Sequence, residues 1–272
     1  MPLTAPQRGA HLGAVATPFG ATHVNVCGPV DGPPVVLLPG GGGATSAAWY
    51  RQAAELSRTR RVFAVDLVGA PGRSVPDRDR RLRTVADVSA WLDALFDGLG
   101  VTAADLCGHS YGAWLALHHA LRAPARVRRL VLLDPTQCFA GFRPGYLLRA
   151  LPSLVRPSPG RVRAFLEWET GVAALDPAWL ALEEAAAGFP SVRPVTGPRP
   201  AAQALRGLDL PVLVLLAGGS RTHDAVKVAA RAEALLPRAE ITVLPGVSHH
   251  ALPHGAPAEA DRRLLDFLNR PR

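Results

Sequence analysis

One serine lies between two glycines in the stretch Gly108-His109-Ser110-Tyr111-Gly112, where an apolar run ends and a helical pattern begins. A serine hydroxyl is a useful nucleophile only when a base can take its proton and N–H groups can hold the oxyanion. A sharp turn from strand to helix meets both needs, and flanking glycines remove Cβ atoms that would collide with the strand and helix. In a chain with 26 glycines the same pattern also fits an ordinary turn, so other residues must support it.

The elements around this turn alternate between short apolar runs and longer helical patterns, which is typical of an α/β fold. The later runs are continuously apolar, as expected for strands covered on both faces. Predicted strands are His23–Cys27, Pro34–Leu38, Arg61–Val65, Ala103–Cys107, Val127–Leu133, Pro211–Leu216 and Glu240–Leu244. Predicted helices are Ala47–Ser57, Leu82–Leu99, Ala113–Leu121, Ala225–Leu236 and Ala258–Leu268. Ser110 is therefore expected between a buried strand and a helix.

The composition favours one large globular domain or a domain with an insertion: 272 residues, 48% hydrophobic and 19% charged. The net charge of +8 comes almost entirely from arginine, since Lys227 is the only lysine. An acid interrupts the basic stretch 78–83, and the stretch 126–129 opens an apolar run. Both are predicted to be solvated faces, so we expect no nucleic-acid partner.

The three cysteines, Cys27, Cys107 and Cys138, are odd in number and widely spaced, which indicates neither a disulfide framework nor a zinc site. A reducing cytoplasm fits them best. The N-terminal stretch lacks the charged start and apolar run of a signal peptide, and no segment approaches the roughly 18 apolar residues of a membrane span. We therefore expect a soluble, unexported protein with no membrane partner.

A stretch between the predicted strands ending at Leu133 and starting at Pro211 is too long for a structureless loop. Its part Arg161–Gly188 has a helix-forming composition and contains Trp168 and Trp179. We predict that residues 136–207 form a helical lid over a pocket at the carboxyl ends of the strands, with these tryptophans lining it. The core is then residues 1–135 and 208–272. The alternative is that the tryptophans only pack at the surface.

Four ordered pieces of the chain, "LLPGGGGATSAAW", "DLVGAPGRS", "GHSYG" and "LPGVSHH", resemble the α/β-hydrolase superfamily over nearly the whole length. The resemblance implies a mostly parallel sheet with helices on both faces, a serine on the turn, a histidine in the last long loop and an acid after a late strand. Serine at the turn is unlike the dehalogenase and epoxide-hydrolase branches, whose nucleophile is a carboxylate. No cofactor is implied.

By this resemblance Ser110 is the nucleophile, and the N–H groups of Tyr111 and Gly41 hold the oxyanion. Many relatives have His-Gly where this chain has Pro39-Gly40. A phosphate cradle is the rival interpretation of the glycine run, but the run has no Gly-Lys-Ser/Thr ending and no G-x-G-x-x-G pattern.

Two adjacent histidines compete for the role of base. His249 has the spacing from Pro245-Gly246 that relatives show, and His250 is the alternative. A metal site made by these two and His254 is disfavoured, because Pro253 opposes a helix there and no carboxylate or cysteine nearby completes a ligand set. His109, His118 and His119 are predicted to be packing or surface residues.

The acid departs from the family pattern, because Arg221 stands where relatives usually carry the carboxylate. Asp134, after the strand Val127–Leu133, is our first candidate, since some branches place the acid there. Asp224 is the alternative, although an aspartate just before a helix is ordinarily its N-cap.

The sequence thus predicts an esterase-like serine hydrolase that cleaves an ester or related acyl compound through an acyl-enzyme, with a small acyl substrate and no metal. Acyl transfer, lyase or cofactor-free peroxidase chemistry on the same fold stays open. So does a non-catalytic binding protein that has lost its acid.

Overall fold

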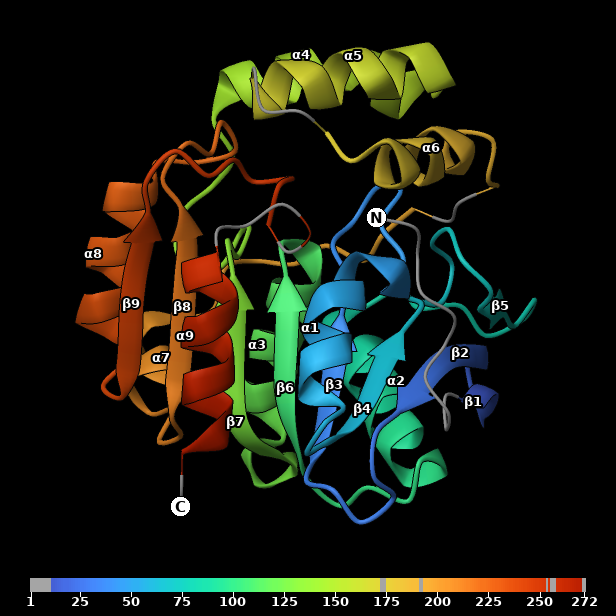
Figure 1. Cartoon of the computed structure of the whole chain (residues 1–272), viewed down its shortest axis with the longest axis vertical. Helices are drawn as coiled ribbons and strands as arrows, with labels where there is room; N and C mark the ends of the chain where they lie inside the picture. The colour runs from blue at the N-terminus through green and yellow to red at the C-terminus, as the bar shows by residue number, and fades with distance from the viewer. Residues whose placement is uncertain (1–10, 172–174, 191–192, 253, 255–257, 271–272) are drawn as a thin grey trace.

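The structure is a computed structural model that describes residues 11–171, 175–190, 193–252, 254 and 258–270. In this part of the chain nine strands form one sheet: β1 (His11–Thr17), β2 (Gly20–Cys27), β3 (Pro34–Leu38), β4 (Arg61–Val65), β5 (Val75–Pro76), β6 (Ala104–His109), β7 (Val127–Leu133), β8 (Val212–Ala217) and β9 (Ala239–Leu244). Their order is β1-β2-β4-β3-β6-β7-β8-β9, with β5 beside β2 (Figure 1). From β4 to β9 neighbours are parallel, whereas all pairs of β2 are antiparallel. The predicted, mostly parallel sheet is confirmed.

Helices cover both faces of this sheet, because side chains alternate between the faces along each strand. In β3, Val36 and Leu38 join the core that contains α2, α3 and α8, whereas Val35 and Leu37 join the core that contains α1 and α9. Figure 1 shows α1 and α9 in front of the sheet and α2 and α3 behind it. The bounds of these helices are α1 (Tyr50–Leu56), α2 (Val85–Gly98), α3 (Tyr111–Arg122), α8 (Ala225–Leu235) and α9 (Ala258–Asn269).

Between β7 and β8 the chain forms α4 (Pro144–Val155), α5 (Pro159–Thr170), α6 (Pro177–Ala186) and α7 (Ala202–Arg206). We call residues 136–207 the insertion. Its helices α4, α5 and α6 lie beyond the carboxyl ends of the strands (Figure 1), and α5 and α6 share a small core made by Leu166, Trp179 and Leu180.

Most predicted elements match the structure to within a few residues, and three strands match at both ends. The predicted helix Ala47–Ser57 is divided: Ser46–Trp49 is a 3₁₀ turn, and α1 follows it. The antiparallel edge strands β1 and β5 were not predicted. Nor was α4, whose interior contains Pro152, a residue that normally opposes a helix.

Candidate active site

Ser110 lies on a strained turn between β6 and α3, with φ 52° and ψ −113°. The flanking residues must be glycines, because backbone atoms of neighbouring segments lie too close to them for a Cβ atom. A Cβ on Gly108 would lie 2.3 Å from the carbonyl oxygen of Gly112, and one on Gly112 would lie 2.3 Å from that of Pro39. The predicted reason for the two glycines is therefore confirmed: neighbouring backbone from α3 and from the end of β3 leaves no room for a side chain.

The structure joins Ser110, His249 and Asp134 by a continuous chain of hydrogen bonds. The Nε2 atom of His249 lies 2.8 Å from Ser110 Oγ, and its Nδ1 atom lies 2.5 Å from Asp134 Oδ2. Because a carboxylate can only accept, Nδ1 carries the proton and Nε2 is free to accept the serine hydroxyl. His249 and Asp134 are at most 1% exposed. This arrangement can generate a nucleophile at Ser110 Oγ.

Asp134 follows β7 with a positive φ of 40° and accepts more than the bond from His249. Its Oδ1 accepts the backbone N–H of Ala217 and Nε2–H of His223, each at 3.0 Å. Burial opposes its ionisation, but the hydrogen bonds and charges of the two histidines outweigh burial and hold the pKa of Asp134 well below its usual value. Asp134 is therefore a carboxylate, able to orient His249 and stabilise its protonated form.

The two alternative residues have other partners. Asp224 caps α8 by accepting Lys227 N–H, and this bond is the main cause of its lowered pKa. The Nε2 atom of His250 lies 3.2 Å from the hydroxyl of Tyr146, and burial lowers the pKa of His250. Arg221 stands at the family's usual acid position. Its guanidinium is directed at Trp168, 4.8 Å from the centre of that ring, and not at His249.

A buried glutamate of the insertion anchors the backbone of the histidine loop. Glu169, in α5 and 1% exposed, accepts N–H groups of His249 and His250 at 3.1 Å and of Arg221 at 3.4 Å. The insertion is thereby bonded to the two loops that carry the histidine partners of Asp134, since His223 follows closely after Arg221.

The cavity beside Ser110 is small, about 20 Å³. Burial raises the pKa of Glu183, in α6, to about 7, and lowers those of His109 and His254 to about 3 and 4. Burial therefore favours the neutral forms of His109 and His254 near pH 7. The lining residues are Gly40, Gly41, Ala44, Ala48, His109, Ser110, Trp179, Glu183, His249, His250 and His254.

Predictions for the pocket are met unequally. Trp179 lines the cavity, but Trp168 is not among the described residues that do so. The ring of Trp168 lies 5.9 Å from that of Phe165, at a tilt of 37°, and close to the guanidinium groups of Arg149 and Arg221. His109 was expected only to pack, yet it lines the cavity.

Gly41 and Tyr111, the predicted oxyanion residues, lie side by side. A Cβ on Gly41 would be 3.4 Å from that of Tyr111, which is the first residue of α3. N–H groups at a helix N-terminus have no partner within the helix, and the helix dipole there favours negative charge.

Three residues of the site were missed by sequence reasoning: His223, Glu169 and Glu183. The partners of His223 and Glu169 lie far away in the sequence, so no local spacing points to these two residues. Only the helical pattern around the two glutamates gave a signal, because a charged residue on the inner face of an amphipathic helix needs a buried partner.

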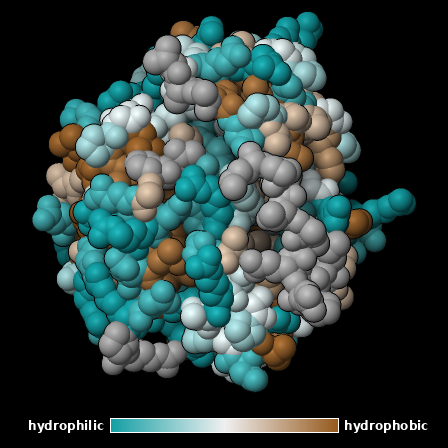
Figure 2. Space-filling model, viewed as in Figure 1, coloured by the Kyte–Doolittle hydropathy of each residue, from teal (hydrophilic) through white to brown (hydrophobic). Residues whose placement is uncertain are grey.

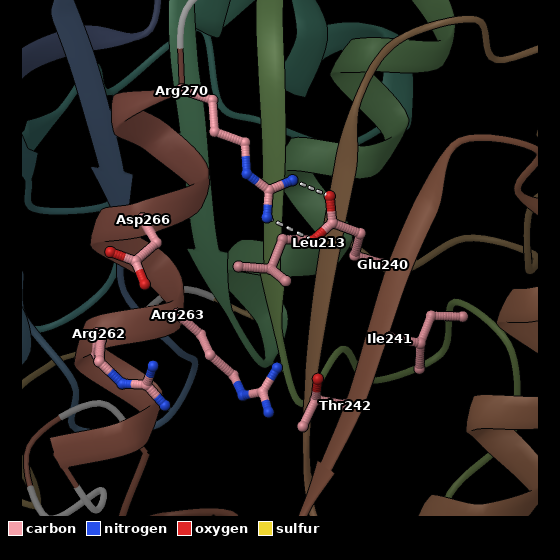
Figure 3. Close-up of a pocket in the computed structure, with 8 residues that line it drawn as sticks. All are labelled: Leu213, Glu240, Ile241, Thr242, Arg262, Arg263, Asp266 and Arg270. Carbon is pink, nitrogen blue, oxygen red and sulfur yellow. Dashed lines mark hydrogen bonds and ion pairs between the residues drawn. The ribbon is translucent and has the colours of Figure 1, made fainter.

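A larger cavity, of about 380 Å³, lies away from Ser110 between β9 and α9 (Figure 3). It is lined mainly by charged side chains, and an ion pair between Arg270 and Glu240 crosses one end. Among the described residues, no group of three or more His, Cys, Asp or Glu side chains is arranged to hold a metal ion.

Comparison with known proteins agrees with the geometry. A model of the Alpha/beta hydrolase family matches residues 35–262. The chain is 31% identical over 264 residues to Carboxylesterase YbfK of Bacillus subtilis (strain 168), covering 93% of this chain and 86% of that protein. The crystal structure of carboxylesterase CesB (YbfK) aligns with a TM-score of 0.88 at 28% identity, covering 97% of this chain and 93% of that one. Naproxen esterase (carboxylesterase NP) from Bacillus subtilis aligns with a TM-score of 0.87 at 29% identity, covering 96% and 92%. The chain therefore belongs to the α/β-hydrolase family.

Proposed function

We propose that this protein is a carboxylesterase that works through an acyl-enzyme on Ser110. The observation that carries the proposal is the hydrogen-bond chain from Ser110 Oγ through His249 to the buried carboxylate of Asp134. The names of the two Bacillus subtilis relatives support an ester as the substrate.

In the first half of the reaction, Ser110 Oγ attacks the ester carbonyl while His249 Nε2 takes its proton. The N–H groups of Gly41 and Tyr111 stabilise the oxyanion. The tetrahedral intermediate then expels the alcohol, which receives the proton from His249. In the second half, water attacks the acyl-enzyme, His249 again accepts and returns a proton, and the carboxylic acid leaves Ser110.

The insertion acts as a lid in this proposal. A cavity of about 20 Å³ holds about one water molecule, so an ester can enter only after side chains of the insertion move. Trp179 and Glu183, both in α6, are the insertion side chains that line the cavity, so they are expected to contact the substrate.

The cytoplasmic location predicted from the unpaired cysteines remains a proposal.

The experiment is a panel of p-nitrophenyl esters of graded acyl length, tested on the wild type, Ser110→Ala and Ser57→Ala. We expect turnover of at least one ester by the wild type and the Ser57→Ala control, and a loss of several powers of ten in Ser110→Ala. Equal turnover by the wild type and Ser110→Ala would contradict the proposal.

A further inference from the structure

The outer face of α4 exposes an apolar stripe. Five of its side chains are between 45% and 72% exposed: Leu147, Leu148, Leu151, Leu154 and Val155. They recur at helical spacing and therefore lie along one side of the helix, which we call the α4 apolar face. Ala150, which borders this face between Leu147 and Leu154, is buried. On the molecular face shown in Figure 2 the surface is largely hydrophilic, with hydrophobic residues in separate patches.

All charged residues in the segment that carries this face are basic. From Pro135 to Leu166 the sequence has five arginines and no aspartate or glutamate. Two of the arginines have acidic neighbours, since Arg163 pairs with Glu184 and Arg143 lies 3.8 Å from Asp224. Arg149 instead lies over the ring of Trp168, and Arg161 donates to the backbone carbonyl of Arg156, which is itself exposed. Neither contact neutralises a positive charge.

Contiguous exposed apolar surface on a soluble domain marks a binding site. A second copy of this chain would bring the same arginines against one another, which is unfavourable. An anionic lipid surface offers both an apolar layer for the leucines and negative headgroups for the arginines, and a helix with apolar and basic sides is the usual form of an interfacial anchor.

We propose that the α4 apolar face docks this protein on an anionic lipid–water interface. The docking is peripheral: no helix among the described residues has the length and apolar character needed to cross a bilayer. The proposal departs from the sequence-based expectation of no membrane partner, which considered only spanning segments.

Docking on this face would place the proposed active site close beneath the lipid. The hydroxyl of Tyr146, in α4, lies 3.2 Å from Nε2 of His250, which lines the cavity beside Ser110. If the proposed esterase function holds, esters dissolved in the interface are the substrates that this geometry favours.

The test is co-sedimentation of the full chain with vesicles of phosphatidylcholine alone or mixed equally with phosphatidylglycerol. We expect binding to the anionic vesicles, weaker binding to the neutral ones, and release by high salt. In the triple variant Leu148→Ser, Leu151→Ser, Leu154→Ser, the partition coefficient onto anionic vesicles should fall at least about tenfold. In the double variant Arg149→Gln, Arg156→Gln, it should fall about tenfold. A matched control removes three exposed valines elsewhere, Val30→Ser, Val75→Ser and Val226→Ser, and should bind like the wild type.

Absence of binding to anionic vesicles, or equal loss in the α4 and control variants, would overturn the proposal. So would sedimentation velocity showing a wild-type dimer that the α4 triple variant abolishes, without vesicle binding. Hydrolysis of soluble p-nitrophenyl acetate, measured on the same samples, verifies that each variant is folded. A wild type that binds anionic vesicles but hydrolyses no ester would support docking and contradict only the proposed function.

Discussion

Replacing Asp134 by asparagine tests the proposed acid, because its two oxygens have different duties. Oδ1 accepts N–H groups from Ala217 and His223, and Oδ2 accepts the Nδ1 proton of His249. An asparagine has one accepting oxygen and one donating NH₂ group. At one of the two oxygen positions, the NH₂ group of the asparagine must therefore face another N–H donor.

The backbone decides which position that is. If the NH₂ group occupies the position of Oδ1, it faces the backbone N–H of Ala217, which is always a donor and cannot become an acceptor. With the NH₂ group at Oδ2, it opposes only His249, whose ring can move its proton to Nε2. His249 then donates toward Ser110 and can no longer accept the serine proton. The wrong tautomer in a triad costs about 10⁴ in kcat, or about 5 kcal/mol in the barrier.

The assay is kcat on the best p-nitrophenyl ester together with the melting temperature, for Asp134→Asn and for Asp224→Asn as the control. We expect Asp134→Asn to lose about four powers of ten with a small change in melting temperature. Asp224→Asn keeps an oxygen that can accept the N–H of Lys227 and removes only a negative charge at the surface, so its activity should remain near that of the wild type. An active Asp134→Asn beside an inactive, folded Asp224→Asn would refute the reasoning.

Two further predictions concern the glutamates of the insertion. Glu169→Gln can still accept two of the three N–H groups but not the third, so we expect kcat to fall about tenfold with little change in KM, and the free energy of unfolding to fall by about 2 kcal/mol. The control is Glu167→Gln, exposed on the same helix, which should change neither kcat nor stability. Equal kinetics in both variants would contradict the positioning role. Glu183 has a folded pKa of about 7 against an ordinary value of 4.5, so the folded state binds the extra proton and the wild type should lose up to about 3 kcal/mol of stability relative to Glu183→Gln as pH rises from 4.5 to 7. Chemical denaturation at several pH values measures this difference, and a constant difference would contradict the buried proton.

The sequence was most informative where function depends on local backbone. Ser110 needs a strained turn, and the turn needs glycines at Gly108 and Gly112, so the pattern is written in five consecutive residues. The parallel strands were equally readable, because burial on both faces produces continuous apolar runs.

Contacts between distant segments were not readable. The bond from His223 to Asp134 joins residues 89 apart, and that from Glu169 to His249 joins residues 80 apart. Trp168 and Trp179 look alike in sequence, yet of the two only Trp179 lines the cavity, whereas Trp168 lies beneath the guanidinium groups of Arg149 and Arg221. The helix α4 was missed because the cost of Pro152 is visible in the sequence, whereas its packing on α5 is not.

Covalent labelling with a fluorophosphonate, followed by mass spectrometry of the peptides, tests the central claim most directly. If Ser110 is the activated nucleophile, the wild type should carry one label on Ser110, and Ser110→Ala should carry none. A label on another serine, or full labelling of Ser110→Ala, would contradict the proposed acyl-enzyme.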